Sequence, residues 1–458
     1  MSTWEGRFKV SLNETPRGVR VHLALFGKRN AGKSSVINAI TGQETAIVSD
    51  VKGTTTDPVF KAMEILPIGP CVIIDTAGID DVGELGQLRI QKTLEVLDIT
   101  DVALLIVDIK RGISEEDRVI IDKFKEKKKP LIVVLNKIDT LENDSENNQQ
   151  SENQSENQSE NESKRKSENQ CENSGKNCSR EQLISGLQEE LATPVVGVSA
   201  LKKQGIKELK NAIISVIPDD EDKFKIVGDL INPGDFVVLV TPIDKAAPKG
   251  RLILPQQQTI RDILESDAMA IVTKEFELRE TLSNLGKKPK LVITDSQVFL
   301  KVAADTPKDI LMTSFSILFA RQKGDLTEFI KGAKAIERLK DGDKVLIAEG
   351  CTHHRQSDDI GKVKIPRWIR QRTGKQIEFE FTAGATFTDD IKKYALIVHC
   401  GACMMNRTGM LSRVDGARYH NVPIVNYGIL IAYVQGLLPR ALEPFPLAKM
   451  ILEEEDLC

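Results

Sequence analysis

One eight-residue segment near the N-terminus has glycine, lysine and serine at a spacing that suits phosphate binding. Residues 27–34 read Gly-Lys-Arg-Asn-Ala-Gly-Lys-Ser and directly follow an apolar run that is typical of a buried strand. The glycines let backbone N–H groups close around a phosphate, and the N-terminus of a following helix favours the same anion. We therefore expect Lys33 to reach the β- and γ-phosphates of a nucleotide and Ser34 to bind Mg²⁺.

Three further motifs follow in order, each at the end of an apolar run. They are Asp75-Thr76-Ala77-Gly78, Asn136-Lys137-Ile138-Asp139 and Ser199-Ala200-Leu201. The carboxylate of Asp139 can accept two hydrogen bonds, from N1–H and from the exocyclic amine of guanine, whereas adenine offers no matching pair of donors. The combination therefore predicts a site that binds and hydrolyses GTP.

The metal and the γ-phosphate have their own expected partners. Asp75 is expected to hold Mg²⁺ through water, and the first switch is expected at residues 53–56, where either Thr54 or Thr55 touches the metal. The predicted catalytic residues are Lys33, Asn30, Thr55 and Gly78, and the predicted magnesium ligands are Ser34, Thr55 and Asp75. The whole predicted nucleotide site comprises Gly27, Lys28, Asn30, Ala31, Gly32, Lys33, Ser34, Ser35, Thr54, Thr55, Asp75, Thr76, Gly78, Asn136, Lys137, Asp139, Ser199 and Ala200.

Cysteine and histidine gather in two short groups near the C-terminus. Cys351-Thr-His353-His follows the apolar run 344–348, and His399-Cys400-Gly-Ala-Cys403 follows the run 394–398. Open α/β sheets place their ligand sites at the carboxyl ends of strands, and Cys-x-x-Cys lets two thiolates reach one metal. A metal site is favoured over small buried thiols, but zinc and an iron–sulfur cluster both accept these ligands and the spacing does not separate them.

Apolar runs that alternate with helix-like segments predict an α/β chain with mainly parallel sheets. A P-loop domain is expected at 1–218, a second α/β domain at 219–306 and a third at 307–458. The tract 142–182 repeats Ser-Glu-Asn-Gln, contains no aliphatic or aromatic residue, and is predicted to be a disordered insertion. The expected buried strands are 21–26, 71–75, 102–108, 131–135, 194–198, 236–240, 268–272, 291–293, 344–348, 394–398 and 422–425.

Composition excludes several classes of protein. The 458 residues carry a formal net charge of −4, which gives no support to a wholesale nucleic-acid or membrane-surface binder. No apolar run approaches the roughly 18 residues that span a bilayer, and the first ten residues lack the apolar region of a signal peptide. We therefore expect a cytoplasmic protein. Seven cysteines in so long a chain disfavour a disulfide framework.

The nucleotide motifs resemble those of the Era/TrmE-like branch of the translation-factor GTPases. Asn30 stands where this branch has a P-loop asparagine that helps to bind potassium, and Ile79 stands where Ras-like enzymes have a catalytic glutamine. The resemblance therefore implies hydrolysis aided by K⁺. A fixed monovalent cation can offset the charge that develops between the β- and γ-phosphates.

A GTPase of this branch that is joined to Cys-x-His and then to His-Cys-x-x-Cys resembles the HydF family of FeFe-hydrogenase maturation GTPases. The resemblance implies that the middle domain dimerises the protein and that the last domain binds a 4Fe–4S cluster. It also implies a transient di-iron precursor, two radical-SAM maturases and apo FeFe-hydrogenase as partners. Cys351, Cys400 and Cys403 are then the cluster thiolates, and His353 and His399 are possible further ligands, as are His354 and Glu349.

A second interpretation is an Era/TrmE-like GTPase that associates with RNA or the ribosome and carries a structural zinc module. It predicts a basic RNA-binding face. The net charge of −4 and the absence of an evident RNA-binding motif argue against it, so neither nucleic acid nor a membrane is expected as a partner. A purely regulatory GTPase with a redox-sensing cluster is a third possibility.

Overall fold

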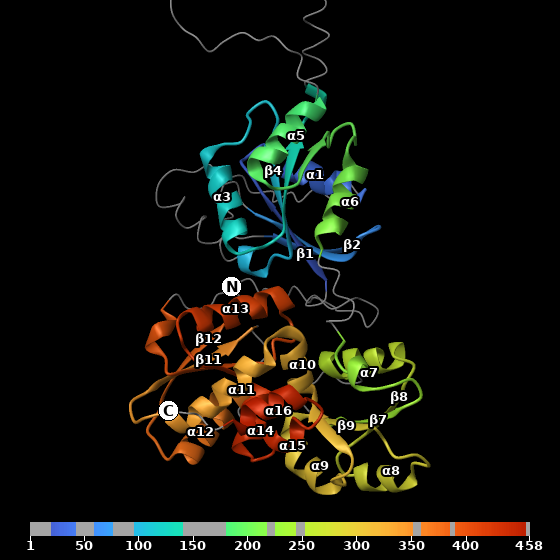
Figure 1. Cartoon of the computed structure of the whole chain (residues 1–458), viewed down its shortest axis with the longest axis vertical. Helices are drawn as coiled ribbons and strands as arrows, with labels where there is room; N and C mark the ends of the chain where they lie inside the picture. Colours follow the sequence, from blue (N-terminus) through green and yellow to red (C-terminus); the bar gives the residue numbers. More distant parts are fainter. Residues whose placement is uncertain are drawn as a thin grey trace, which may run out of the picture. The chain divides into compact units, whose positions relative to one another are not determined.

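The computed structural model describes residues 20–42, 59–76, 96–140, 180–217, 225–243, 252–350, 359–384 and 390–454. The chain divides into two compact units, one formed by Arg20–Pro218 and the other mainly by Asp219–Cys458. Figure 1 shows the helices and strands of each unit in sequence colours.

The first unit is built on a six-stranded sheet within the described residues, in the order β2-β3-β1-β4-β5-β6. Its strands are parallel except for the edge strand β2, which is antiparallel to β3. The strands are β1 (Val21–Phe26), β2 (Val59–Ile65), β3 (Gly69–Asp75), β4 (Val102–Asp108), β5 (Leu131–Asn136) and β6 (Val195–Val198).

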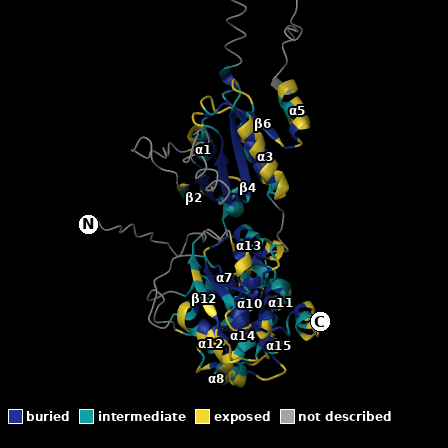
Figure 2. Ribbon diagram, turned by 90° about the vertical axis from the view of Figure 1, so that its left-hand side faces the viewer, coloured by how far each residue is buried: buried dark blue, intermediate teal, exposed yellow. Residues whose placement is uncertain are grey.

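Helices cover both faces of this sheet, which explains why the inner strands are apolar along their whole length. The apolar side chains of α1 (Lys33–Thr41) and α6 (Ile206–Val216) pack on one face, and those of α3 (Glu115–Glu126) and α5 (Arg180–Leu191) pack on the other. In Figure 2 the central strands are buried, whereas the outer faces of α3 and α5 are exposed. A hydrophobic layer therefore lies between the sheet and the helices on each face, and it holds the strands and their carboxyl ends in place.

The second unit contains two four-stranded sheets, and every described strand pair in them is parallel. The first sheet has the order β10-β9-β7-β8. Its strands are β7 (Phe236–Val240), β8 (Met269–Thr273), β9 (Leu291–Thr294) and β10 (Leu311–Ser314), and its helices are α7 (Leu254–Glu265), α8 (Leu278–Asn284), α9 (Phe299–Asp305) and α10 (Phe315–Lys323).

The second sheet has the order β12-β11-β13-β14. Its strands are β11 (Lys344–Glu349), β12 (Glu378–Ala383), β13 (Leu396–His399) and β14 (Ile424–Asn426). The helices of this part are α11 (Leu326–Lys334), α12 (Ile365–Thr373), α13 (Arg407–Tyr419), α14 (Tyr427–Val434), α15 (Leu438–Ala441) and α16 (Pro446–Glu453).

One hydrophobic cluster runs through both sheets of the second unit, from Ile226 to Ala448. Close packing of α11 on β14 contributes to it. A Cβ atom at Gly332 would lie 1.9 Å from the carbonyl oxygen of Ile424, so only glycine permits this approach. The predicted α/β fold class with mainly parallel sheets is confirmed, whereas the predicted domain boundaries remain a prediction.

Two further results complete the fold. The predicted insertion lies mostly outside the described residues, and α5 begins at Arg180. Within the described part of the chain, no helix is both long enough and apolar enough to cross a membrane.

Candidate nucleotide and metal sites

The predicted phosphate-binding loop connects β1 to α1, and two of its glycines cannot be replaced without a clash. Gly27 has φ 132°, and a Cβ atom there would lie 2.2 Å from the carbonyl oxygen of Ile106. Gly32 has φ 95°, and a Cβ atom there would lie 2.2 Å from Nδ2 of Asn136. The loop therefore fits against the neighbouring strand ends because these positions lack side chains.

The N-cap of helix α1 is Gly32, which has no side chain to bond to the first turn. This leaves the N-terminus of a nine-residue helix suited to an anion. Ser34 and Ser35 lie exposed in that first turn, and Asn30 is exposed in the loop with φ 63°. The Lys33 ammonium donates hydrogen bonds to the carbonyl oxygens of Gly27 at 2.8 Å and Lys28 at 3.1 Å.

Asp75 ends β3, beside Leu25 of β1. Its Oδ1 atom is buried and has no hydrogen-bond partner among the described residues. Burial raises the pKa of this carboxyl, and the charge of Lys33 opposes the rise. An orphaned carboxylate oxygen near the charge of Lys33, the lysine predicted to bind phosphate, fits a hydrated Mg²⁺. The neighbouring Thr76 is buried and donates from Oγ1 to the carbonyl oxygen of Leu25 at 2.6 Å, so it fixes the strand end.

The Asn-Lys-x-Asp motif ties the phosphate-binding loop to the last motif. Nδ2 of Asn136 donates to the carbonyl oxygen of Ala31 at 3.0 Å, and Oδ1 of Asn136 accepts from the backbone N–H of Ala200 at 3.2 Å. The Ser199 hydroxyl donates to Oδ1 of Asp139 at 2.6 Å. The structure thus brings three of the predicted motifs together at one edge of the sheet.

Lys137 reaches back over the loop. Its ammonium donates to the carbonyl oxygen of Asn30 at 3.0 Å and to Oδ2 of Asp108 at 2.7 Å. Burial raises the pKa of Asp108, but the bonds from Lys137 and Lys110 outweigh it and the pKa is lowered overall. Asp108 was not among the predicted site residues, although its place at the carboxyl end of an apolar run was a usable signal.

Several predicted site residues lie outside the described residues. They are Thr54, Thr55, Gly78, Cys351, His353 and His354.

The two cysteine-containing groups follow neighbouring strands of the last sheet. Ala348 of β11 pairs with His399 of β13, and the backbone N–H of Cys400 continues the ladder by donating to Ala348 at 2.9 Å. Sγ of Cys400 accepts from the backbone N–H of Gly350 at 3.1 Å and of Ala402 at 3.4 Å. Burial raises the pKa of the Cys400 thiol, and these two N–H groups partly offset the rise.

His399 is fully buried, and both of its ring nitrogens already have partners. Nδ1 lies 2.8 Å from the carbonyl oxygen of Cys400, and Nε2 lies 2.6 Å from a guanidinium nitrogen of Arg413. Burial and the charge of Arg413 lower the pKa of His399 to about 3. The ring is therefore neutral, donates from Nδ1 and accepts at Nε2. The spacing of the motif gave no signal for Arg413.

Glu349 ends β11 and is buried, with Oε1 at 3.5 Å from the Tyr427 hydroxyl. Cys403 is half-buried, and its carbonyl oxygen accepts from the ammonium of Lys323. Among the described residues, no three His, Cys, Asp or Glu side chains are grouped closely enough to hold a metal ion. Two thiols on one turn, one of them accepting two backbone N–H bonds, nevertheless suit an iron–sulfur cluster or zinc.

Family models match three stretches of the chain. A model described as a 50S ribosome-binding GTPase matches residues 22–137. The hydrogen maturase F dimerization domain matches 226–324, and the hydrogen maturase F tetramerization domain matches 327–444. Fold and site therefore define a P-loop GTPase domain followed by two domains whose family names describe oligomerisation.

The chain matches the HydF-type maturase GTPases, because the models of both hydrogen maturase F domains follow that of the GTPase domain in one polypeptide. The family resemblance expected from the motifs is thus confirmed.

Curated relatives match part of the chain. The tRNA modification GTPase MnmE of Desulforamulus reducens is 40% identical over 120 residues, which are 26% of this chain and 25% of that protein. GTPase Der of Chloroflexus aurantiacus is 38% identical over 141 residues, or 30% of this chain and 31% of that protein. The chain thus spans between a quarter and a third of the length of these relatives.

Solved structures show a weaker likeness. Era of Aquifex aeolicus bound to GDP and AlF4⁻ is 22% identical, with a TM-score of 0.32, over 58% of this chain and 98% of that one. The G domain of the T. maritima FeoB iron transporter is 19% identical, with a TM-score of 0.27, over 43% and 98%.

Proposed function

We propose that this chain is a GTP-hydrolysing scaffold that binds a 4Fe–4S cluster and that assembles and delivers the di-iron precursor of FeFe-hydrogenase. The observation that supports it most is the hydrogen bond from Gly350 to Cys400, which joins the two halves of the cysteine motif in a chain with both hydrogen maturase F domains. The proposed partners are a second copy of this chain, two radical-SAM maturases and apo FeFe-hydrogenase, in the cytoplasm.

In this proposal the first unit binds Mg²⁺ and GTP. Backbone N–H groups of the loop 27–34 and the ammonium of Lys33 bind the phosphates, while Asp75 and Ser34 orient the hydrated magnesium. Asp139 accepts from the guanine edge, and the Ser199 hydroxyl at 2.6 Å holds its carboxylate in place. Asn30 helps to bind K⁺, and Thr54 or Thr55 together with Gly78 complete the site around the γ-phosphate.

Cys351, Cys400 and Cys403 are the proposed thiolate ligands of the cluster. When bound, such a cluster supplies an iron that can accept a bridging or exchangeable partner. Both ring nitrogens of His399 are already bonded, so the fourth position falls more naturally to His353 or to an exchangeable small ligand. An open position suits a scaffold that must take up a precursor and release it again, as catalytic zinc sites keep one position open.

In this proposal each of the three domains has its own role. Residues 1–218 bind and hydrolyse GTP, residues 219–306 dimerise the protein, and residues 307–458 bind the cluster. GTP binding biases contacts between domains or partners, and hydrolysis resets them.

A transfer assay tests the proposal. The chain is produced with the two radical-SAM maturases, purified without oxygen and mixed with apo FeFe-hydrogenase, and hydrogen evolution is measured. We expect activation by this protein and none by the same chain produced without the maturases. Equal hydrogen evolution from both preparations would remove the scaffold role.

A further inference from the structure

Lys323 lies at the end of α10 and is 4% exposed, which is unusual for a lysine. Its ammonium donates to three backbone carbonyl oxygens: Ala402 at 3.0 Å, Cys403 at 3.1 Å and Met405 at 2.9 Å. An ammonium has three N–H donors, so these three bonds use all of them. All three acceptors belong to the loop that contains Cys403 and directly follows Cys400.

The conformation of that loop depends on such support. Ala402 has φ 50°, a left-handed conformation that residues with a side chain rarely adopt. Its carbonyl oxygen accepts from Lys323 and also from the backbone N–H of Met405 at 3.1 Å. Three carbonyl groups of the loop therefore point to the buried ammonium of Lys323. The Cys400 thiol, in turn, accepts hydrogen bonds from two backbone N–H groups.

Lys323 is also electrostatically coupled to the two thiols. Burial lowers the pKa of its ammonium to about 8, while negative charge on Cys403 and Cys400 would raise it. A buried cation next to thiolates stabilises negative charge on whatever they bind, because the local dielectric is low.

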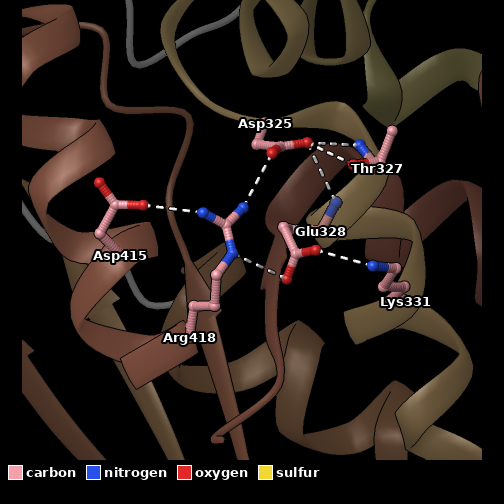
Figure 3. A network of polar contacts seen from close by, with 6 residues as sticks. All are labelled: Asp325, Thr327, Glu328, Lys331, Asp415 and Arg418. Atoms are coloured by element: carbon pink, nitrogen blue, oxygen red, sulfur yellow. Dashed lines mark hydrogen bonds and ion pairs between the residues drawn. The ribbon is translucent and has the colours of Figure 1, made fainter. Parts of the chain in front are cut away.

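The neighbours of Lys323 hold the helix that follows the loop. The Arg407 guanidinium at the start of α13 donates to the carbonyl oxygen of Gln322. Near the end of α13, Arg418 donates to Asp325 at 2.9 Å and Asp415 at 2.9 Å and lies 3.8 Å from Glu328 (Figure 3). Residues 322–328, from the end of α10 to the start of α11, are thus bonded near both ends of α13 as well as to the cysteine loop.

We propose that Lys323 is a positioning residue for the cluster: it fixes the conformation of the Cys400–Cys403 loop and places one positive charge beside the bound group. This inference rests on the proposed function, since it assumes that the loop binds an iron–sulfur cluster. It predicts that the residue governs both how firmly iron is retained and the midpoint potential of the cluster. Removing a positive charge disfavours the more negative, reduced state, so the potential falls.

The test compares Lys323→Met, Lys323→Gln and the control Lys331→Met, all purified without oxygen as full-length chains. Lys331 is a suitable control because its side chain is 62% exposed and pairs with Glu328 on the same helix, so the same charge is lost away from the loop. Iron retention against a chelator and the midpoint potential, followed by electron paramagnetic resonance, are measured for each protein. GTP hydrolysis by the first unit and thermal unfolding report on folding.

We expect Lys323→Met to retain iron about tenfold less firmly than the parent, as for other residues that support metal ligands. Its midpoint potential should be more negative. Lys323→Gln keeps N–H donors but no charge, so it should retain iron better than the methionine variant while showing the same negative shift. Lys331→Met should match the parent in both.

Parental retention and potential in folded Lys323→Met would overturn the inference. If that variant fails to fold, Lys323→Gln decides: parental values in it overturn the inference equally, and a negative shift supports it. A parent protein that contains zinc and no sulfide would instead overturn the proposed function, so the two failures are distinguishable.

Discussion

The backbone N–H of Gly350 donates to Sγ of Cys400 at 3.1 Å, which brings the ends of β11 and β13 together at the cysteine motif. The parallel pairing of Ala348 with His399 produces this contact, because residues that follow paired positions emerge at the same edge of the sheet. A Cβ atom at Gly350 would lie 3.8 Å from Sγ of Cys400. Cys351 is the next residue of the chain, so the two cysteine-containing groups, which are far apart in sequence, begin close together at the ends of β11 and β13.

Changing Asp139 to Asn should alter the base that the first unit prefers. The carboxylate is held by Ser199 and would lose its ability to accept two hydrogen bonds from guanine. Each bond to a charged group contributes about 1.5–3 kcal/mol, so affinity for GTP should fall about a hundredfold or more. The amide of asparagine can donate to the extra carbonyl of xanthine, so affinity for xanthosine triphosphate should rise. Nucleotide titration measures both, and unchanged GTP affinity would remove Asp139 from the base site.

Lys33→Ala should abolish GTP hydrolysis and leave the cluster in place. The ammonium donates to Gly27 and Lys28 and is the cation expected on the phosphates, so its loss should slow turnover about a hundredfold or more. Phosphate release and iron content are measured on the same preparation. Loss of iron together with turnover would show that the two sites are not separable.

Asp75→Asn should make the nucleotide-free protein more stable at neutral pH but unable to hydrolyse GTP. Burial raises the pKa of Asp75 above its value in the unfolded chain, so the folded state binds the proton more tightly. The free energy of unfolding therefore falls as the pH rises from the unfolded-state pKa through the folded-state pKa. Asparagine has no charge to desolvate. Its advantage should therefore shrink as pH is lowered toward about 4, the range of an unperturbed carboxyl.

Unfolding by denaturant at several pH values, without and with Mg²⁺ and GTP, measures these effects. A variant that is less stable than the parent at pH 7 without nucleotide would contradict the assignment of Asp75 as a buried magnesium-orienting carboxylate.

His399→Gln should weaken the second unit without changing the nature of the cluster. The substitution disrupts the bonds to Cys400 and Arg413, and a buried group that loses its partner costs about 1–3 kcal/mol. Arg413→Met should produce a similar loss, and the double variant should lose less than the sum because the two residues are in contact. Spectra normalised to folded protein should match the parent. An altered cluster spectrum in a stable His399→Gln protein would make His399 a ligand.

All inner strands of the described sheets could be predicted from the sequence, whereas three of the strands at the sheet edges could not. Every strand predicted from an apolar run is present within two residues of its expected bounds, because both faces of inner strands need apolar side chains. The strands that were missed, β2, β10 and β12, each lie at the edge of a sheet. β2 and β12 are partly exposed and contain charged residues, and β10 has only two apolar residues, Leu311 and Met312.

The residues of the two sites likewise fall into those that the sequence predicted and those that it did not. The nucleotide motifs could be predicted because each is a short contiguous segment of residues that follows a strand. Lys323 and Arg413 were missed because they act through space: Lys323 lies 80 positions before Cys403, and neither belongs to a local pattern. Asp108 was missed as a partner of Lys137 because the two residues lie 29 positions apart, although Asp108 ends an apolar run.

Iron, acid-labile sulfide and zinc, measured on protein purified without oxygen, test the central claim most directly. The parent is compared with Cys403→Ser and with the control Cys71→Ser, whose thiol is buried in the first unit and bonded to Gly69. We predict about four iron and four sulfide per chain in the parent and in Cys71→Ser, as a 4Fe–4S cluster requires, and a clear loss of both in Cys403→Ser. One zinc per chain without sulfide, or equal iron in Cys403→Ser and the parent, would contradict the account.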